Sequence, residues 1–158
     1  MAAPPRRSAG ILLFRRRLEL QVLLAHMGGP FWQRKEEGAW TVPKGEPVDV
    51  EELLETAQRE FAEELGLPAP NGPLHDLGEI RQSGGKVVRV WALEGDLDPA
   101  DIRPGTFQLE WPPRSGRMQE FPEIDRAAWL TPAQASPLIV AGQRPFLDRL
   151  EALLQRDG

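Results

Sequence analysis

Three glutamates and an arginine lie within nine residues of the sequence, in REFAEELGL (59–67). Glu60 and Glu64 are four residues apart in a predicted helix, a spacing at which like charges repel one another. One interpretation is an acidic helix face in contact with water. The other is a bound divalent cation such as Mg²⁺, which prefers hard oxygen ligands and keeps water molecules for substrate phosphates.

Helical geometry places Glu64 on the face of this helix that should be buried. At about 100° per residue, five apolar side chains form one continuous arc. They are Leu53, Leu54, Ala57, Phe61 and Leu65. Glu64 projects into this arc, Glu60 lies at its edge and Glu63 lies further round. Because an uncompensated buried charge is strongly destabilising, Glu64 must be neutral, paired with a buried Arg or Lys, or bound to a metal ion. The helix alone does not distinguish a buried Arg or Lys partner from a bound metal ion.

The residues before the helix extend this pattern. The segment GEPVDVEELLETAQREFAEELGL (45–67) resembles the signature of the Nudix hydrolases, G-x(5)-E-x(7)-R-E-U-x-E-E-x-G-U, in which U is a bulky apolar residue. Seven fixed positions match in register: Gly45, Glu51, Arg59, Glu60, Glu63, Glu64 and Gly66. Phe61 and Leu67 fill the apolar positions, although Phe61 is aromatic where the family more often has an aliphatic residue. Many fixed residues at fixed spacing make this a specific signal.

The resemblance implies a fold and a metal site. The expected fold is α/β, a Nudix-like α/β/α sandwich with a mixed β-sheet, with residues 1–158 forming a single Nudix hydrolase domain and the signature forming a loop, a helix and a loop. Glu60 and Glu64 would ligate Mg²⁺, for which Mn²⁺ may substitute. Glu63 would be a further ligand or act through water, and Gly45 would belong to the same site.

The resemblance also implies a reaction. Arg59 would orient the carboxylates and Glu51 would anchor Arg59, so that these two residues and the three glutamates form the catalytic set. Hydrolysis of a pyrophosphate bond requires neutralised phosphate oxygens and a positioned water, which Mg²⁺ on clustered carboxylates supplies. We expect water to attack phosphorus, with one glutamate or a metal-bound hydroxide as the base.

Lys44, in AWTVPKGE, places a cation beside the acidic site. We interpret it as a phosphate contact, the alternative being a solvated loop residue or an ion-pair partner. The Pro-Lys-Gly sequence at this position also resembles Nudix members that act on dinucleoside polyphosphates, inositol pyrophosphates and capped or triphosphorylated RNA.

Further candidates lie outside the signature. Arg114 and Arg117 are predicted to contact phosphates, and Trp32 or Trp111 to stack on a nucleobase. Glu120 or Glu123 is a possible additional acid. For all of these, the alternatives are solvated surface charges and tryptophans that close the core. We interpret His26 and His75 as structural, because neither has a partner at metal-site spacing.

The elements that must position these residues follow from periodicity and turn signals. We expect strands at 8–14, 18–26, 74–82, 86–95, 106–111 and 127–130, with a short strand before Pro43. We expect loops at 27–38 and 112–125. The acidic helix should span 51–65, with Asp49 as N-cap, Glu52 completing a capping box and Gly66 at its end. A short helix within 131–140 and an amphipathic helix over 144–156 complete the pattern.

Composition narrows the class of protein. The chain has 158 residues, no cysteine and a net charge of −5. It contains no apolar stretch of membrane-spanning length, and we expect no signal peptide. The acidic balance argues against non-specific nucleic-acid binding. We therefore expect a cytoplasmic enzyme that hydrolyses a nucleoside triphosphate or dinucleoside polyphosphate. The alternatives are an RNA 5′-end pyrophosphohydrolase and a non-catalytic module that senses nucleotides.

Overall fold

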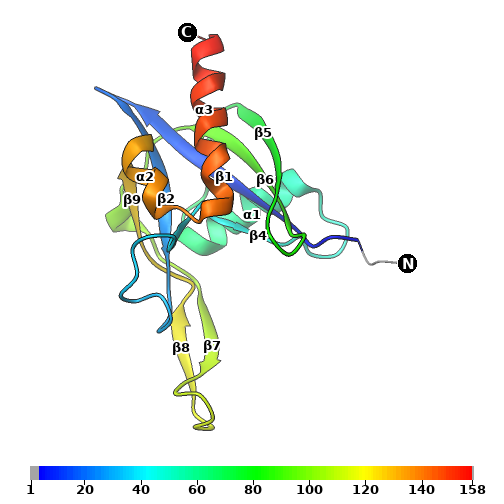
Figure 1. Cartoon of the computed structure of the whole chain (residues 1–158), viewed down its shortest axis with the longest axis vertical. Helices are drawn as coiled ribbons and strands as arrows, with labels where there is room; N and C mark the ends of the chain where they lie inside the picture. Colours follow the sequence, from blue (N-terminus) through cyan, green and yellow to red (C-terminus); the bar gives the residue numbers. More distant parts are fainter. Residues whose placement is uncertain (1–3, 158) are drawn as a thin grey trace.

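A mixed seven-stranded sheet forms the centre of the computed structural model, which describes residues 4–157 (Figure 1). Five strands run in the order β3-β2-β1-β6-β5, with β4 pairing with β1 and β9 pairing with β2. Their bounds are β1 Arg7–Arg16, β2 Leu20–Met27, β3 Trp40–Thr41, β4 Lys44–Gly45, β5 Leu74–Arg81, β6 Val87–Glu94 and β9 Ile124–Leu130. The pairing of β1 with β6 is parallel and the other strand pairings are antiparallel, so the sheet is mixed as predicted.

Helices cover both faces of this sheet. Alternate residues of β1 point to opposite faces: Ile11 and Leu13 pack with α1 (Leu53–Leu65), whereas Leu12 and Phe14 pack in the cluster that contains α3 (Arg144–Asp157). The short helix α2 (Pro132–Leu138) lies on the α3 side (Figure 1). The molecule is therefore the α/β/α sandwich that the sequence predicts. Among the helices of residues 4–157, none has both the length and the apolar composition needed to cross a membrane.

The acidic helix α1 buries the predicted apolar arc. Ala57, Phe61 and Leu65 are fully buried against the sheet, and Leu53 and Leu54 are partly buried. Gly66 ends the helix in a left-handed conformation (φ 71°) and donates its N–H to the carbonyl of Ala62, which confirms the predicted stop. The terminal helix is also confirmed, with Phe146, Leu147 and Leu150 buried.

The predicted start of α1 is wrong. The helix begins at Leu53 with Glu52 as N-cap, no side chain caps it, and Asp49 lies outside it with φ 50°. The reason is local competition for hydrogen bonds. The carboxylate of Glu51 accepts bonds from the N–H of Val48, the hydroxyl of Thr56 and the guanidinium of Arg59, so it holds the loop against the helix in place of a capping box.

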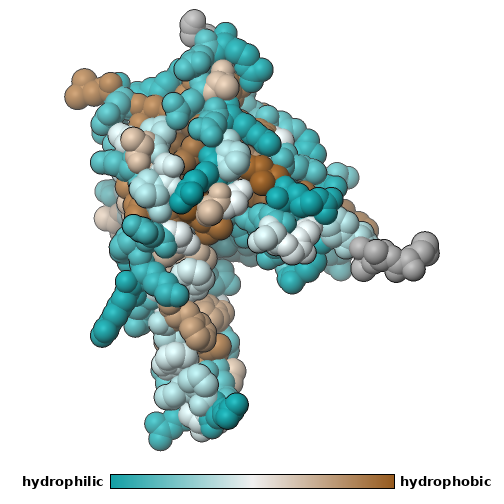
Figure 2. Space-filling model, viewed as in Figure 1, coloured by the Kyte–Doolittle hydropathy of each residue, from teal (hydrophilic) through white to brown (hydrophobic). Residues whose placement is uncertain are grey.

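The second half of the expected loop over 112–125 is strand. β7 (Thr106–Glu110) and β8 (Met118–Pro122) pair as a separate two-stranded sheet, and β9 starts at Ile124. These two strands form an arm that extends away from the sandwich (Figure 1). Figure 2 shows apolar residues where the arm leaves the body and hydrophilic residues over its tip. The alternation in MQEFP is too short to distinguish a strand from a loop.

Two 3₁₀ turns complete the chain, η1 (Pro99–Asp101) and η2 (Ala141–Gln143). Gln143 in η2 is buried and ties the α3 side to β3, because its side-chain oxygen accepts the N–H of Val42 at 3.0 Å and its amide donates to the Thr41 hydroxyl at 2.9 Å.

Replacing Phe61 by Ala should destabilise the protein by about 3–5 kcal/mol, because it leaves a cavity between α1 and the sheet. Urea unfolding followed by circular dichroism measures the change. Leu18→Ala is the control, since Leu18 is fully exposed and its loss should change the free energy of unfolding by less than about 0.5 kcal/mol. Equal effects of the two substitutions would contradict the packing described here.

Candidate active site

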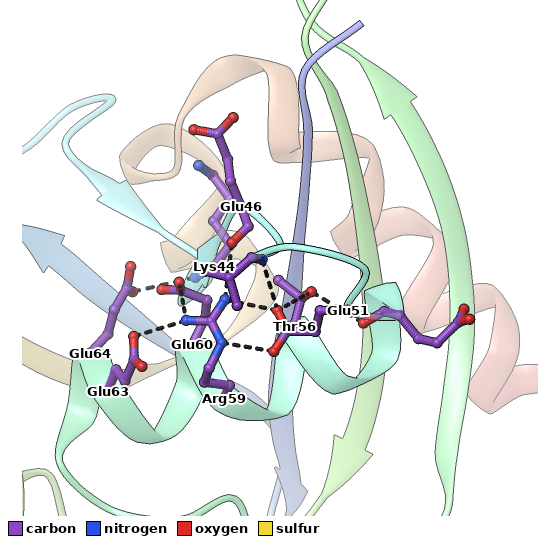
Figure 3. A network of polar contacts seen from close by, with 10 residues as sticks. Lys44, Glu46, Glu51, Thr56, Arg59, Glu60, Glu63 and Glu64 are labelled. Atoms are coloured by element: carbon purple, nitrogen blue, oxygen red, sulfur yellow. Dashed lines mark hydrogen bonds and ion pairs between the residues drawn. The ribbon is translucent and has the colours of Figure 1, made fainter. Parts of the chain in front are cut away.

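Arg59 is the centre of a carboxylate network on α1 (Figure 3). Its Nε and Nη2 donate to the two oxygens of Glu51 at 2.9 Å each. Its Nη1 donates to Glu60 at 2.9 Å and to Glu63 at 3.0 Å, and its Nη2 also reaches the carbonyl of Glu46 at 3.0 Å. One guanidinium therefore fixes three carboxylates and the loop that precedes the helix.

Glu51 is bound more tightly than any other carboxylate in this network. Hydrogen bonds from Arg59 and Thr56 lower the pKa of Glu51 to about 2, and its side chain is only 13% exposed. Conversely, Glu51 is the main cause that raises the pKa of Arg59. This arrangement accords with the expectation that Glu51 anchors Arg59. The hydroxyl of Thr56, which donates to Glu51 at 2.7 Å, lies in a variable position of the signature and was not predicted.

Gly45 supports the Glu60 carboxylate. A Cβ atom added at Gly45 would overlap the carboxylate of Glu60, so the absence of a side chain at residue 45 makes room for it. β4 places Gly45 there, because Ala9 and Gly10 of β1 pair with Gly45 and Lys44. A side chain at residue 45 would therefore displace the Glu60 carboxylate from the position in which Arg59 holds it.

Glu64 is half-buried beside β4. Burial first, and repulsion from Glu60 and Glu123 second, raise the pKa of Glu64 to about 8. The backbone N–H of Lys44 donates to it at 3.3 Å. Among the side chains of residues 4–156, no Arg or Lys forms an ion pair with Glu64, so the buried-partner alternative finds no support. The carboxyl group must therefore be protonated or neutralised by an added cation.

Glu123 joins the site from the junction between β8 and β9. Its N–H donates to the carbonyl of Gly105 at 2.9 Å, and its own carbonyl accepts the N–H of Gly28 at 2.9 Å. Burial, followed by repulsion from Glu60 and Glu63, raises the pKa of Glu123. Of the two candidates for an additional acid, Glu123 therefore faces the carboxylates of α1. Glu120 lies on β8 and its carboxylate accepts a hydrogen bond from Gln108 across the arm.

Lys44 lies half-buried between these carboxylates and a second lysine. Burial, and next the charge of Lys86, lower the pKa of Lys44, while Glu64, Glu46 and Glu60 act in the opposite direction. The Lys44 ammonium forms no ion pair within the described part of the chain. A half-buried ammonium beside an acidic site, without a paired carboxylate, is suited to an anionic ligand.

The other predicted contacts do not converge on α1. Arg114 and Arg117 lie in the exposed turn at the tip of the arm, which extends away from the sandwich (Figure 1). Trp32 packs against the core on the α3 side. Trp111 meets Phe31 edge to face at 5.2 Å. Phosphate contact by these arginines and base stacking by these tryptophans stay predictions.

The buried His26 is accounted for by structural contacts. Its Nδ1 lies 3.0 Å from Asp125 and its Nε2 lies 2.6 Å from the carbonyl of Lys35. These bonds hold the 28–38 loop against β9. His75, on β5, makes no contact with the carboxylate network.

The donor chemistry fits a hard divalent cation. Glu60, Glu63, Glu64 and Glu123 supply carboxylate oxygens. The pKa values of Glu64 and Glu123 are raised first by burial and then by repulsion from the other carboxylates, and a cation would relieve this repulsion. Within residues 4–157, no three of these side chains are close enough to form a complete metal cage. Mg²⁺ needs no such cage, because it is commonly bound by one or two carboxylates, waters and substrate phosphates.

Comparisons with known proteins show which family profile and which solved structures this chain resembles. The NUDIX domain profile matches residues 4–150. Among curated protein sequences, none matches significantly. An Ap4A hydrolase of C. elegans, solved as a binary complex, is 19% identical, with 95% of this chain and 98% of that one aligned at a TM-score of 0.67.

Two further solved structures share the fold. The NUDIX domain of Shewanella oneidensis NrtR, complexed with ADP ribose, is 17% identical over 98% of this chain and 90% of that one, with a TM-score of 0.63. A MutT protein from Methanosarcina mazei Go1 is 20% identical over 96% of each chain, with a TM-score of 0.61. At these identities the structural likeness establishes the fold alone.

The stability of the metal-free protein should fall as pH rises from about 4.5 to about 8. Glu64 binds its proton more tightly when folded (pKa about 8) than at its ordinary value of 4.5, so deprotonation favours the unfolded state across this interval. The loss should be on the order of a few kcal/mol. Glu64→Gln should reduce this slope to the smaller part that Glu123, whose pKa is also raised, contributes. Urea unfolding in chelator at several pH values tests the prediction.

Glu55→Gln is the matched control, because Glu55 lies exposed on the same helix and should keep the wild-type slope. Adding Mg²⁺ at pH 8 should stabilise the wild type more than Glu64→Gln. An identical pH slope in the wild type and Glu64→Gln would show that Glu64 is not held protonated by burial.

Proposed function

Because this chain belongs to the Nudix family, and is thereby a hydrolase acting on phosphoric anhydrides, we propose that it is a cytoplasmic, Mg²⁺-dependent pyrophosphohydrolase of nucleoside triphosphates or dinucleoside polyphosphates. The observation that carries the proposal is the buried Glu64 carboxyl, which faces Glu60 and Glu123 and has no cationic side chain bound to it among the described residues. A divalent ion is the partner that such a group lacks.

Each residue of the network has a place in this chemistry. Glu60 and Glu64 would hold the ion, with Glu63 and the Gly45 segment beside them, and Mn²⁺ would substitute for Mg²⁺. When bound, the ion would neutralise phosphate oxygens. Arg59 would keep Glu60 and Glu63 oriented. Because its hydrogen bonds to both carboxylates are already formed, no free energy of reorganisation is needed when the reaction takes place.

The reaction itself is a hydrolysis at phosphorus. The oxygen of a water molecule would form a bond to phosphorus as the anhydride bond breaks and the leaving phosphate departs. Lys44 would pair with phosphate oxygens through its ammonium. Glu123 would take the proton of the water, because it faces the site, forms no ion pair in the described part of the chain, and has a pKa shifted upward.

Support for a nucleotide-type substrate comes from Lys44 and from the relatives. The structural neighbours include an Ap4A hydrolase and a domain complexed with ADP ribose. These two ligand names describe those proteins, and here they motivate the choice of substrates to test. The half-buried ammonium beside the carboxylates adds a phosphate contact that an anhydride chain would use.

The test is a release assay for phosphate and pyrophosphate. Nucleoside triphosphates, dinucleoside polyphosphates, ADP-ribose, inositol pyrophosphates and triphosphorylated RNA should be compared with Mg²⁺ and with chelator. We expect chelator-sensitive turnover of nucleoside triphosphates or dinucleoside polyphosphates. Turnover confined to RNA would favour the 5′-end alternative. Tight nucleotide binding without product, from folded protein with Mg²⁺, would favour a sensing module.

Glu64→Gln should lower kcat/KM on the substrate so found by roughly 10³-fold or more, because it removes a group that acts directly in the reaction. Circular dichroism should show an unchanged fold. Glu55→Gln changes the same residue type on the exposed face of α1 and should keep wild-type activity. Full activity in Glu64→Gln would exclude Glu64 from the site.

A further inference from the structure

A cavity of about 570 Å³ lies between the start of β1 and the turn that joins β5 to β6. Figure 1 shows this turn beside the first residues of β1, and the N–H of Val87 donates to the carbonyl of Arg6 at 2.9 Å. Three cationic residues, Arg6, Arg81 and Lys86, line the cavity. Within the described chain, no Asp or Glu lines it. The cavity is therefore a basic pocket on an acidic protein.

Two of these cations are available to a ligand. Arg6 is engaged in a bidentate pair with Glu46, at 3.0 and 2.6 Å. Lys86 forms no ion pair with any residue that the structure describes, and the only polar contact of the Arg81 side chain there is a long one, 3.4 Å, to the carbonyl of Gly85. The Lys86 charge also acts on Lys44, so the two ammonium groups lie near enough to repel one another. The Glu46 carboxylate, which pairs with Arg6, already attracts both ammonium groups. A further anion between them would relieve the remaining repulsion.

The turn between β5 and β6 leaves room for a ligand to approach its backbone closely. Gly84 and Gly85 have φ values of 87° and 84°, which favour glycine at both positions. A Cβ atom added at Gly84 would meet no atom within 4 Å. Crowding therefore does not explain this glycine, and the turn leaves the exposed backbone of Gly84 and the half-buried Lys86 beside an open space.

The basic pocket continues from the catalytic carboxylates. The N–H of Lys44 bonds to Glu64, and Lys44 pairs with Gly10 on β1. Three to four residues separate Gly10 from the Arg6 end of β1, a distance of roughly 10–13 Å at the rise of a strand. A ligand that touches both ends must be elongated, and it must be negatively charged at the end far from α1.

We propose that the basic pocket binds the distal phosphates of an oligophosphate chain whose scissile anhydride lies at the carboxylates. Lys86 and Arg81 donate to the distal phosphates, and Lys44 bridges the two parts of the site. This inference rests on the proposed function and narrows its substrate to molecules with more phosphates than the carboxylate site alone accommodates, such as nucleoside tetraphosphates and longer dinucleoside polyphosphates.

Binding of inorganic tripolyphosphate in chelator tests the pocket without catalysis. By calorimetry at low salt, the double variant Arg81→Ala/Lys86→Ala should bind roughly tenfold more weakly than wild type. Lys86→Arg should bind nearly as wild type, and Arg156→Ala, which removes an exposed cation on α3, should bind as wild type. Unchanged binding in the double variant, with an unchanged melting temperature, would overturn the proposal. So would Lys86-dependent binding of a short 5′-hydroxyl RNA as tight as that of tripolyphosphate.

Turnover separates this inference from the proposed function. With Mg²⁺, the ratio of kcat/KM for adenosine tetraphosphate to that for ATP should fall roughly tenfold in the double variant. Turnover with an unchanged ratio would refute the pocket while the hydrolase assignment holds. Absence of turnover, with Lys86-dependent binding of tripolyphosphate intact, would refute the hydrolase assignment and support the pocket.

Discussion

The burial of the Glu64 carboxyl group among other carboxylates is the constraint on which the site depends. A helix that packs Phe61 and Leu65 into the core necessarily carries Glu64 toward the sheet, and Glu60 and Glu123 face the same space. Such a cluster is unfavourable unless protons or a cation occupy it. The proposed divalent ion would relieve this local instability when it binds. Strongly shifted pKa values of this kind are common at functional sites.

Arg59 stabilises part of this carboxylate cluster but does not neutralise Glu64. Its guanidinium binds Glu51, Glu60 and Glu63 but forms no bond to the Glu64 carboxyl group (Figure 3). The sheet supplies the other half of the arrangement. β4 brings Gly45 and Lys44 against α1, and the hydrogen bonds of Glu123 to Gly28 and Gly105 bring a third segment to the same place. Two neighbouring elements, β4 and α1, and the distant segment at Glu123 therefore converge on one group of oxygens.

The sequence predicts the parts of this site that depend on helical periodicity and fixed spacing. Helical periodicity alone places Glu64 on the face of α1 that packs against the sheet, and Gly66 ends the helix as predicted. The bond between Glu51 and Arg59 was implied only by the resemblance to the Nudix signature. Prediction from the sequence fails where side chains compete for the same backbone groups. Asp49 does not cap α1, because Glu51 holds the preceding loop in another conformation. It also cannot choose between Glu120 and Glu123, because the choice depends on the arm formed by β7 and β8, whose pairing is a tertiary feature. Lys86 and Arg81 carry no local signal at all, since only the pairing of β1 with β6 brings the turn that holds Lys86 to the start of β1.

Anomalous diffraction from crystals grown with Mn²⁺ would test most directly whether the carboxylates of α1 hold a divalent ion. We expect a peak with oxygens of Glu60 and Glu64 about 2.0–2.2 Å away, close to the distances of Mg²⁺ sites, and no such peak in crystals of Glu64→Gln. A wild-type structure without a peak at these carboxylates, at Mn²⁺ concentrations that support turnover, would contradict the role assigned to Glu64.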